Sequence, residues 1–255
     1  MRLFIESVAR EAGKEALAYF TDMKHFTVSG KATTRDLVSD ADRAVEKKII
    51  ELIRAEYPEH SIFGEETGRD TGNSEYCWVI DPIDGTQSFV KRHPYFSISI
   101  ALKKNGKTIA GCVYAPVLGL MFSAEEGKGA FENGVPMHVS DCDEIGNAAC
   151  ATGFACLRAQ KMEHNNLKYF NEIVPLIRDI KRCGSAALDL AFVASGRYDA
   201  YWEFSLAEYD IAAGIFLVES AGGVVLKPSN GNPELELSVL AANPVLIKQF
   251  QPFFE

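Results

Sequence analysis

Residues 78–86 of this chain read Trp78-Val79-Ile80-Asp81-Pro82-Ile83-Asp84-Gly85-Thr86. The apolar run that begins at Cys77 predicts a short buried strand. The strand ends in two carboxylates, and we expect both to be exposed at its carboxyl end, where open α/β folds place their ligands. Pro82 has no N–H to donate, so we expect strand pairing to end there. Gly85 lets the backbone approach a ligand closely, and a helix that begins at about Thr86 would offer free N–H groups to a phosphate.

The spacing of these carboxylates separates several alternative functions. An EF-hand that started at Asp81 would need an oxygen ligand at loop position 3 and a glutamate at position 12, where the chain has Ile83 and Arg92. A haloacid-dehalogenase-type phosphatase carries its two aspartates two residues apart. Asp81 and Asp84 are three apart, which disfavours an aspartyl-phosphate intermediate. A turn with solvated acids stays open as the alternative without function, because Asp-Gly is a common turn dipeptide.

Helical periodicity precedes this stretch. Apolar residues recur at three- and four-residue intervals from Phe4 to Leu17, which predicts an amphipathic helix. A second helix is predicted to start after Ser39 or Asp40, because both are good N-cap types. Pro58 marks its end.

Strand periodicity follows it. Residues 96–102 alternate with a period of two, and Asn105-Gly106 then turns the chain into the apolar run 109–114. Residues 120–124 and the turn at Asn133-Gly134 continue this antiparallel pattern. From about residue 145 short strands alternate with helices. We predict strands near Ala149 and Ile180 and at Gly223–Leu226 and Val239–Ala241, and helices at about Ser185–Ser195, at about Asp210–Ala221 and after Pro244.

These patterns predict two halves that are docked into one globular unit without a linker. Residues 1–145 form an N-terminal α+β half with an antiparallel sheet and the metal-binding motifs. Residues 146–255 form a C-terminal half in which α and β elements alternate. A chain of 255 residues fits this organisation. The expected fold class is α+β or α/β, with layered sheets and with helices between and outside them.

Composition restricts the partners and the compartment. A net charge of −9 argues against broad binding to a phosphate backbone, so we expect no nucleic acid polymer as a partner. No apolar run reaches the ~18 residues of a membrane span, and no secretory signal is apparent. The six cysteines and five histidines show no zinc-binding spacing, which favours reduced thiols. We therefore expect a cytoplasmic protein that does not contact a membrane.

Several acidic motifs together resemble the inositol monophosphatase family in order and spacing along nearly the whole chain. The long Asp-Pro-Ile-Asp-Gly-Thr block is the specific part of this resemblance, and the shorter motifs are weak alone. The resemblance implies the layered αβαβα sandwich of that family. The motifs are Lys31 with Asp36 to Asp42, Gly64-Glu65-Glu66, residues 78–89, Gly184-Ser185-Ala186-Ala187, Glu203, Asp210-Ile211-Ala212-Ala213-Gly214, and Glu219-Ser220-Ala221-Gly222-Gly223.

The resemblance implies a site for two to three Mg²⁺ ions on Glu65, Asp81, Asp84 and Asp210, together with the backbone carbonyl of Ile83. Physical chemistry makes this grouping plausible. Two carboxylates ~4 Å apart repel by about 4 kcal/mol at an effective dielectric constant of 20, so four in one cleft require cations or raised pKa values. Hard oxygen ligands with open positions suit Mg²⁺.

The resemblance also implies roles for individual residues. Thr86, backed by Asp42, would orient the attacking water in an in-line displacement, and Glu65 is the competing candidate for the proton acceptor. Three positions depart from the family pattern. Tyr209 stands where tryptophan is usual, Glu208 adds an acid beside the metal ligand, and Gln87 follows Thr86 where threonine, asparagine or arginine is more usual. The residues implied to bind the substrate are Gly85, Thr86, Gly184, Ser185, Glu203 and Asp84, with Lys31 in a possible mobile loop.

The implied function is Mg²⁺-dependent, lithium-sensitive hydrolysis of small polyol phosphate monoesters, with myo-inositol 1-phosphate as the leading substrate. Fructose 1,6-bisphosphate, histidinol phosphate and 3′-phosphoadenosine 5′-phosphate are alternative substrates of the same site. A non-catalytic metal- or phosphate-binding regulator is the alternative from another class. The resemblance implies a homodimer as well. We expect the segment after Cys150 to contribute to it through Phe154, Leu157, Leu167 and Phe170.

Overall fold

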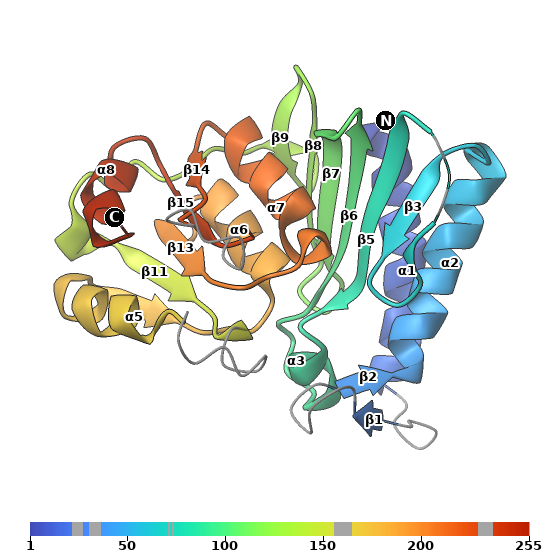
Figure 1. The fold of residues 1–255 in the computed structure, drawn as a ribbon, viewed down its shortest axis with the longest axis horizontal. Helices are drawn as coiled ribbons and strands as arrows, with labels where there is room; N and C mark the ends of the chain where they lie inside the picture. The colour runs from blue at the N-terminus through green and yellow to red at the C-terminus, as the bar shows by residue number, and fades with distance from the viewer. Residues whose placement is uncertain are drawn as a thin grey trace.

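The structure, a computed structural model, shows five layers of secondary structure (Figure 1). A helix pair, a large sheet, a second helix pair, a small sheet and an outer group of helices follow one another. The αβαβα arrangement implied by the resemblance is therefore confirmed. No helix in the described part of the chain is both long and apolar enough to cross a membrane. The structure describes residues 1–21, 28–30, 37–70, 72, 74–155, 165–228 and 237–254.

The first layer is the pair α1 (Arg2–Thr21) and α2 (Asp40–Glu56), which covers the outer face of the large sheet (Figure 1). Both helices were predicted, and α2 begins directly after Ser39. Their apolar stripes are buried against Trp78 and other residues of the sheet. A short antiparallel pair, β1 (Val28–Gly30) and β2 (Leu37–Ser39), leads into α2.

The large sheet has eight strands in the spatial order β10-β9-β8-β7-β6-β5-β3-β4. All neighbours are antiparallel except β3 and β5, which are parallel, so the expected wholly antiparallel first half was wrong at this pair. The edge strands β10 and β4 contain two residues each. In chain order the strands are β3 (Ser61–Gly64), β4 (Gly68–Arg69), β5 (Tyr76–Asp84), β6 (Ser97–Lys104), β7 (Lys107–Ala115), β8 (Leu120–Glu125), β9 (Gly129–Glu132) and β10 (Val135–Pro136).

The two predicted hairpin turns are confirmed. Asn105 and Gly106 have φ angles of 49° and 82° between β6 and β7, and Asn133 and Gly134 have 48° and 82° between β9 and β10. Positive φ at both central residues is what a two-residue turn with the twist of its strands requires. Asparagine and glycine tolerate that conformation better than other residues do, which is why the sequence located these turns.

Strand β5 carries the acidic stretch and corrects two predictions about it. Its pairing with β6 does not end at Pro82: Asp81 pairs with Ser99 and Asp84 with Ser97, with a bulge between them. The bulge leaves the proline, which has no N–H, outside the regular pairing. The two carboxylates are not exposed either, since Asp81 is 1% and Asp84 is 7% accessible. Helices of the central layer cover them.

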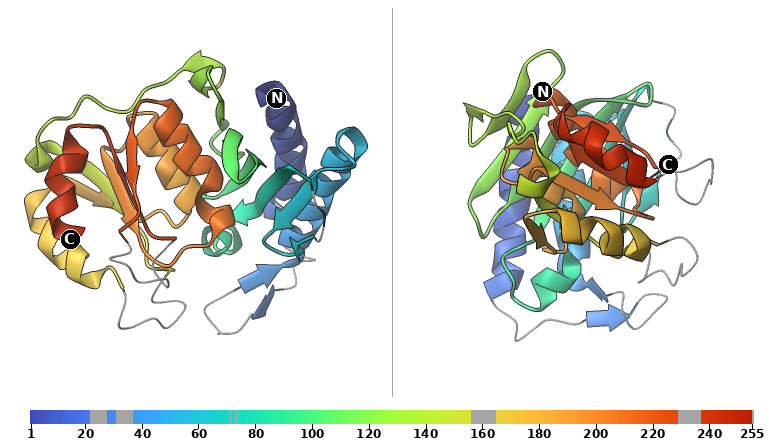
Figure 2. Two further views of the ribbon diagram at one scale, coloured as in Figure 1. Left: turned by 45° about the horizontal axis from the view of Figure 1, so that its top comes forward. Right: turned by 90° about the vertical axis from the view of Figure 1, so that its left-hand side faces the viewer.

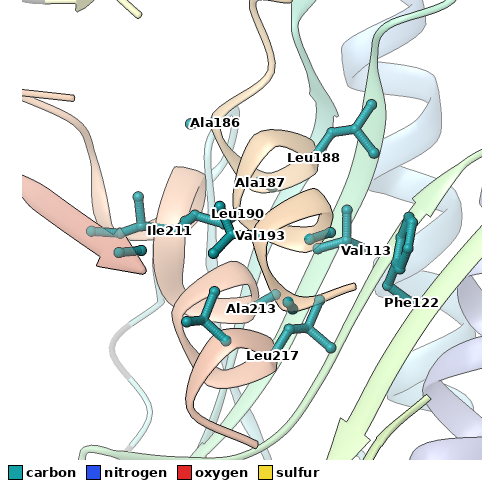
Figure 3. Packing of buried hydrophobic residues seen from close by; sticks show 14 of the residues in the cluster. Val113, Phe122, Ala186, Ala187, Leu188, Leu190, Val193, Ile211, Ala213 and Leu217 are labelled. Atoms are coloured by element: carbon teal, nitrogen blue, oxygen red, sulfur yellow. The ribbon is translucent and has the colours of Figure 1, made fainter. Parts of the chain in front are cut away.

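That central layer consists of α6 (Ala186–Ala194) and α7 (Glu208–Ser220), both close to their predicted ranges. Every residue of α6 is buried, because it lies between the two sheets. Figure 3 shows the apolar side chains of both helices packed beside Val113 of β7 and Phe122 of β8. The helices approach each other closely at Gly214, where a Cβ atom would lie 2.7 Å from Leu190.

The small sheet has the order β12-β11-β13-β15-β14 and mixes parallel and antiparallel pairs. Helices α5 (Leu167–Ile173) and α8 (Leu246–Phe250) lie on its outer side (Figure 2). An aromatic cluster that includes Trp202, Phe204 and Phe250 packs there. Because α6 and α7 pack against both sheets, the division after residue 145 stays a prediction. The remaining elements are η2 (Ile145–Asn147), β11 (Ala149–Thr152), η3 (Val174–Leu176), β12 (Asp179–Lys181), β13 (Ala200–Glu203), β14 (Val224–Leu226), β15 (Val239–Ala242) and η5 (Gln251–Phe254).

The contact between Gly214 and Leu190 generates a prediction. Alanine in place of glycine ordinarily stabilises a helix by about 1 kcal/mol. Here the added methyl group meets Leu190, so Gly214→Ala should lower the free energy of unfolding by roughly 1–3 kcal/mol, as overpacking does. Urea unfolding measures the change. In a Leu190→Ala background, which makes room for the methyl group, the same substitution should be neutral or stabilising. An equal loss in both backgrounds would contradict the close approach.

Candidate metal centre and substrate pocket

Three of the predicted metal ligands meet at one point of the structure. Asp81 and Asp84 come from the end of β5, and Asp210 comes from the first turn of α7. One carboxylate oxygen of each lies within 4.8 Å of the other two. Asp81 and Asp84 are buried, and Asp210 is half-buried. Residues that are more than a hundred positions apart in the sequence are therefore brought into one acidic group.

Backbone N–H groups orient two of these carboxylates. The Ile83 N–H donates to Asp81 Oδ1 at 3.1 Å, across the bulge of β5. The Ala207 N–H donates to Asp210 Oδ2 at 2.6 Å. Ala207 is the N-cap of α7 and Asp210 is its third residue, so this bond is the half of a capping box in which the third side chain accepts from the N-cap N–H.

Asp84 is held by the first turn of α6. Its Oδ2 accepts hydrogen bonds from the Ser185 hydroxyl at 2.5 Å and from the Ala187 N–H at 2.7 Å. Ser185 is the N-cap of that helix, and its Oγ also accepts from the Leu188 N–H at 3.2 Å. We predicted Ser185 as a substrate ligand. That role stays a prediction. The Ser185 side chain is fully buried and its hydroxyl is bonded to Asp84, so the side chain supports the carboxylate.

Burial raises the pKa of all three carboxyl groups. For Asp84 the pKa rises to about 7, and the hydrogen bonds from Ser185 and Ala187 oppose the rise. For Asp81 and Asp210 burial again acts first, and the charges of neighbouring carboxylates then raise the pKa further. The group is therefore costly to ionise unless a cation compensates it.

The donor set fits a hard divalent cation. It offers carboxylate oxygens within 4.8 Å of one another, and magnesium prefers oxygen ligands with several positions left for water or phosphate. Ile83, whose carbonyl was predicted as a further ligand, is buried directly between Asp81 and Asp84. Its carbonyl oxygen accepts a hydrogen bond from the Thr86 hydroxyl at 3.3 Å, which leaves its second lone pair for a cation.

Glu65, the fourth predicted carboxylate, is not part of the group of three. It lies in the turn between β3 and β4, where its N–H donates to the Ile80 carbonyl at 3.1 Å. Its charge contributes to the raised pKa of Asp81, so the two groups are within electrostatic range. The turn is held by a residue that the sequence analysis missed: buried Glu46 of α2 accepts from the N–H groups of Glu66 and Thr67 at 3.0 and 2.8 Å.

The Gly85-Thr86 turn has the predicted geometry. Gly85 has a φ of 95°, and a Cβ atom there would lie 3.0 Å from the Tyr95 carbonyl oxygen, so only glycine fits. Helix α3 (Thr86–Val90) begins at the predicted residue. Asp42 is buried, and its charge is among the causes of the raised pKa of Asp81. Its support of Thr86 stays a prediction, and Lys31 lies outside the described residues.

A pocket opens beside Asp84 and Asp210, and Glu203 forms part of its wall. Glu203 Oε2 accepts from the Tyr201 hydroxyl at 2.5 Å, and Oε1 accepts from the Ala155 N–H at 2.8 Å. The carboxylate is therefore fixed, and only 5% of the residue is accessible. The described residues that line the pocket are Asp84, Gly153, Arg182, Gly184, Ala186, Glu203, Leu206 and Asp210.

Three lining residues were missed by the sequence analysis: Gly153, Arg182 and Leu206. Gly153 lies against Glu203, and a Cβ atom there would overlap its carboxylate at 2.0 Å. Arg182 lies over Gly184, with a guanidinium nitrogen 2.7 Å from the position of a Cβ atom on that glycine. Arg182 stands two residues before the Gly184 motif, and this position could have indicated it. A cation next to an acidic cleft favours anionic ligands.

Comparisons with known proteins agree with this geometry. The model of the inositol monophosphatase family matches residues 1–252. The Nus factor SuhB of Pseudomonas aeruginosa is 40% identical over 239 residues, which is 92% of this chain and 88% of that protein. The extragenic suppressor protein SuhB of Bartonella henselae superposes with a TM-score of 0.91 at 33% identity, covering 99% of this chain and 97% of that one. Inositol monophosphatase from Anabaena superposes with a TM-score of 0.85 at 34% identity, covering 98% and 93%.

The carboxylate group predicts a stability response to metal. Mg²⁺ that binds only the native state should raise the melting temperature, since 100-fold excess over Kd adds about 2.7 kcal/mol. Asp84→Asn removes a ligand while its amide oxygen can still accept from Ser185, so it should fold and lose the response. Thermal unfolding of EDTA-treated protein against Mg²⁺ concentration measures this.

Asp189→Asn is the matched control, because Asp189 is a carboxyl of α6 that is buried like Asp84 but lies outside the group of three. This variant should keep most of the Mg²⁺ response. Identical Mg²⁺ curves for Asp84→Asn and the unmodified protein would remove Asp84 from the ligand set.

Proposed function

Because this chain belongs to the inositol monophosphatase family, we propose that it is a Mg²⁺-dependent phosphatase of small polyol phosphate monoesters, with myo-inositol 1-phosphate as its leading substrate. The observation that carries the proposal is the group of Asp81, Asp84 and Asp210 at the edge of a pocket that contains Glu203. Carboxylates for metal and a fixed carboxylate for hydroxyl groups lie side by side there. The other three monoesters named above remain alternative substrates of the same site.

The metal ligands of the proposed enzyme are Asp81, Asp84 and Asp210, together with Glu65 and the carbonyl of Ile83. Two to three Mg²⁺ ions bound there would compensate the carboxylates and supply the positive charge that an anionic phosphate and its transition state require. The chain itself provides the rest: Ser185 and Ala187 keep Asp84 oriented, and Ala207 keeps Asp210 oriented.

Gly85 and Thr86 are the proposed binding site for the phosphate group of the substrate. Helix α3 begins there, and the N–H groups of a first helical turn have no acceptor inside the helix. The left-handed Gly85 is the N-cap of this helix and directly follows Asp84 in the chain. The Thr86 hydroxyl lies 3.3 Å from the Ile83 carbonyl, where Thr86, supported by Asp42, would orient the attacking water. Glu65 is the competing proton acceptor.

Glu203 is the residue proposed to recognise the hydroxyl groups of the polyol. Its carboxylate accepts hydrogen bonds from Tyr201 and Ala155, which fix its orientation. Its remaining lone pairs are proposed to accept from hydroxyl groups in the pocket that Glu203 lines. A site built to accept hydrogen bonds from hydroxyl groups rejects analogues that lack them, because its own polar groups then stay unpaired. This favours inositol phosphates over substrates without adjacent hydroxyl groups. Gly184 lines the same pocket, with the Arg182 guanidinium beside it.

Further properties follow from the same proposal. We expect a cytoplasmic enzyme inhibited by Li⁺, without a nucleic acid polymer or a membrane as its partner. The five described cysteines are free, as reduced thiols would be. The name that the SuhB relatives carry favours a second candidate role, that of a Nus factor. Complementation of Escherichia coli cells that lack SuhB tests this role. If the Asp84→Asn variant complements as well as the unmodified chain does, the role is independent of the metal site.

A phosphate-release assay over the four monoesters tests the proposal. We expect release in Mg²⁺, none in EDTA, and the highest kcat/KM on inositol 1-phosphate. Glu203→Gln should lower kcat/KM on inositol 1-phosphate by a factor that corresponds to roughly 1–3 kcal/mol of lost transition-state stabilisation. This is the cost of losing hydrogen bonds to a charged group. An aryl phosphate should be hydrolysed almost as fast as before.

Tyr201→Phe provides the control for this variant, since it removes the support of Glu203 but leaves its charge. Its effect on inositol 1-phosphate should be smaller. Equal losses on the aryl and inositol substrates in Glu203→Gln would mean that Glu203 supports the fold or the metal site, not the polyol.

The homodimer stays part of the proposal. Phe154 and Phe170 contact each other edge to face, with ring centroids 5.7 Å apart, whereas Leu167 is 38% accessible; Leu157 lies outside the described residues. Of the predicted interface residues that the structure describes, Leu167 is exposed and Phe154 and Phe170 are half-buried. Sedimentation equilibrium should give about twice the chain mass of 28.0 kDa, and a mass of 28.0 kDa at micromolar concentration would exclude the dimer.

A further inference from the structure

Glu208, the acid that departs from the family pattern, joins three elements around the metal centre. It is the first residue of α7, two positions before Asp210. Its Oε1 accepts from the Lys103 ammonium, and its Oε2 accepts from the Arg69 guanidinium at 3.2 Å. The Lys103 side chain is 22% accessible and that of Glu208 is 25%, so this pair is largely shielded from water.

The two cations belong to the elements that carry the other carboxylates. Lys103 lies on β6 opposite Cys77 of β5, the strand that ends in Asp81 and Asp84. Arg69 is the last residue of β4, directly after the turn that contains Glu65. One carboxylate of α7 is therefore bound to β6, the neighbour of the strand that carries Asp81, and to the hairpin of Glu65.

Aromatic and polar contacts extend this connection. The Arg69 guanidinium lies over the Phe63 ring, 4.5 Å from its centroid, and Phe63 contacts Tyr209 edge to face at 5.8 Å. The Ser99 hydroxyl donates to the Tyr209 carbonyl at 3.3 Å. Ser99 is the residue that pairs with Asp81 in the sheet. The first turn of α7 is thus fixed to β3, β4 and β6 on the side facing β5.

The metal centre needs such a connection. Asp210 stands on a helix whose first turn must approach Asp81 and Asp84, and like charges at this separation push α7 away from the sheet. A negative charge at the first position of α7 is favourable for the helix dipole, and its pairing with Lys103 opposes that displacement.

We propose that Glu208 is a positioning residue of the metal centre: by binding Lys103 and Arg69 it holds Asp210 at its distance from Asp81 and Glu65. This inference rests on the metal ligands of the proposed function, but not on the identity of the substrate. Glu208 makes no contact with the pocket in the described structure, so its effect passes through α7.

A competing explanation is that Glu208 acts only through its charge, as one more anion near a cation. The two explanations predict opposite changes in Mg²⁺ affinity when Lys103 is replaced. If Glu208 acts by positioning, removing either partner of the pair weakens Mg²⁺ binding. If it acts only through its charge, Glu208→Gln weakens binding and Lys103→Gln strengthens it, because a positive charge near the metal has been removed.

Isothermal titration of EDTA-treated protein with Mg²⁺ distinguishes them. We expect Glu208→Gln and Lys103→Gln each to weaken binding by roughly tenfold, the low end for groups that orient metal ligands. The double variant should be no weaker than either single variant, as for two members of one interaction. High Mg²⁺ should restore kcat in all three, which a general loss of structure would not allow.

Glu132→Gln is the matched control. Glu132 pairs with Arg197, and its side chain has a similar accessibility of 22%. The substitution removes the same charge at a position that does not line the pocket. It should leave the Kd for Mg²⁺ unchanged. If Glu208→Gln does not fold, Lys103→Gln and Arg69→Gln each break one arm and carry the same expectation.

Tighter or unchanged Mg²⁺ binding in Lys103→Gln would overturn the inference, as would an unchanged Kd in Glu208→Gln. A protein that binds no Mg²⁺ would also overturn it. Weakened binding in both variants of a protein that releases no phosphate from any monoester would support the inference while the proposed function fails. The two failures are thereby distinguishable.

Discussion

Electrostatic repulsion among buried carboxylates is the constraint on which the site depends. Buried Asp81 and Asp84 and half-buried Asp210 are brought together where water screens their charges poorly, and the pKa of each is raised by burial. Such a group does not assemble by itself. The hydrophobic packing of two sheets around one helix pair must supply the free energy that holds it, and a cation then recovers part of that cost.

The helix pair between the sheets does more than fill the core. Asp84 accepts an N–H bond from the first turn of α6, while Asp210 is itself in the first turn of α7. The positive ends of two helix dipoles therefore meet at the acidic group and favour the charged form of its members. Because every residue of α6 is buried and all of them except Asp189 are apolar, the helix can lie between two sheets and still present its N-terminus to the site.

The sequence was informative where a local rule acts alone. Asn-Gly located two hairpin turns, and periodicity located α1, α2, α6 and α7. It failed where tertiary contacts decide: the bulge that continues β5 past Pro82, the pairing of the short strand β3, and helix α5. The motifs indicated the site carboxylates, but not that Ser185 would bind Asp84 or that Glu46 would hold the turn of Glu65. Partners so far apart in the chain leave no signal in local spacing.

The large sheet ends in two very short strands, and this has a consequence for how copies of the chain meet. An exposed long edge would present free backbone groups and invite another strand, which leads to runaway aggregation. Here the edge strand β10 has two residues, one of them Pro136 without an N–H, and the opposite edge β4 also has two. Both faces of the sheet are covered by helices. Any association between copies at this sheet must therefore be made by side chains, which can be selected for a single closed geometry, and not by an open-ended extension of the backbone ladder.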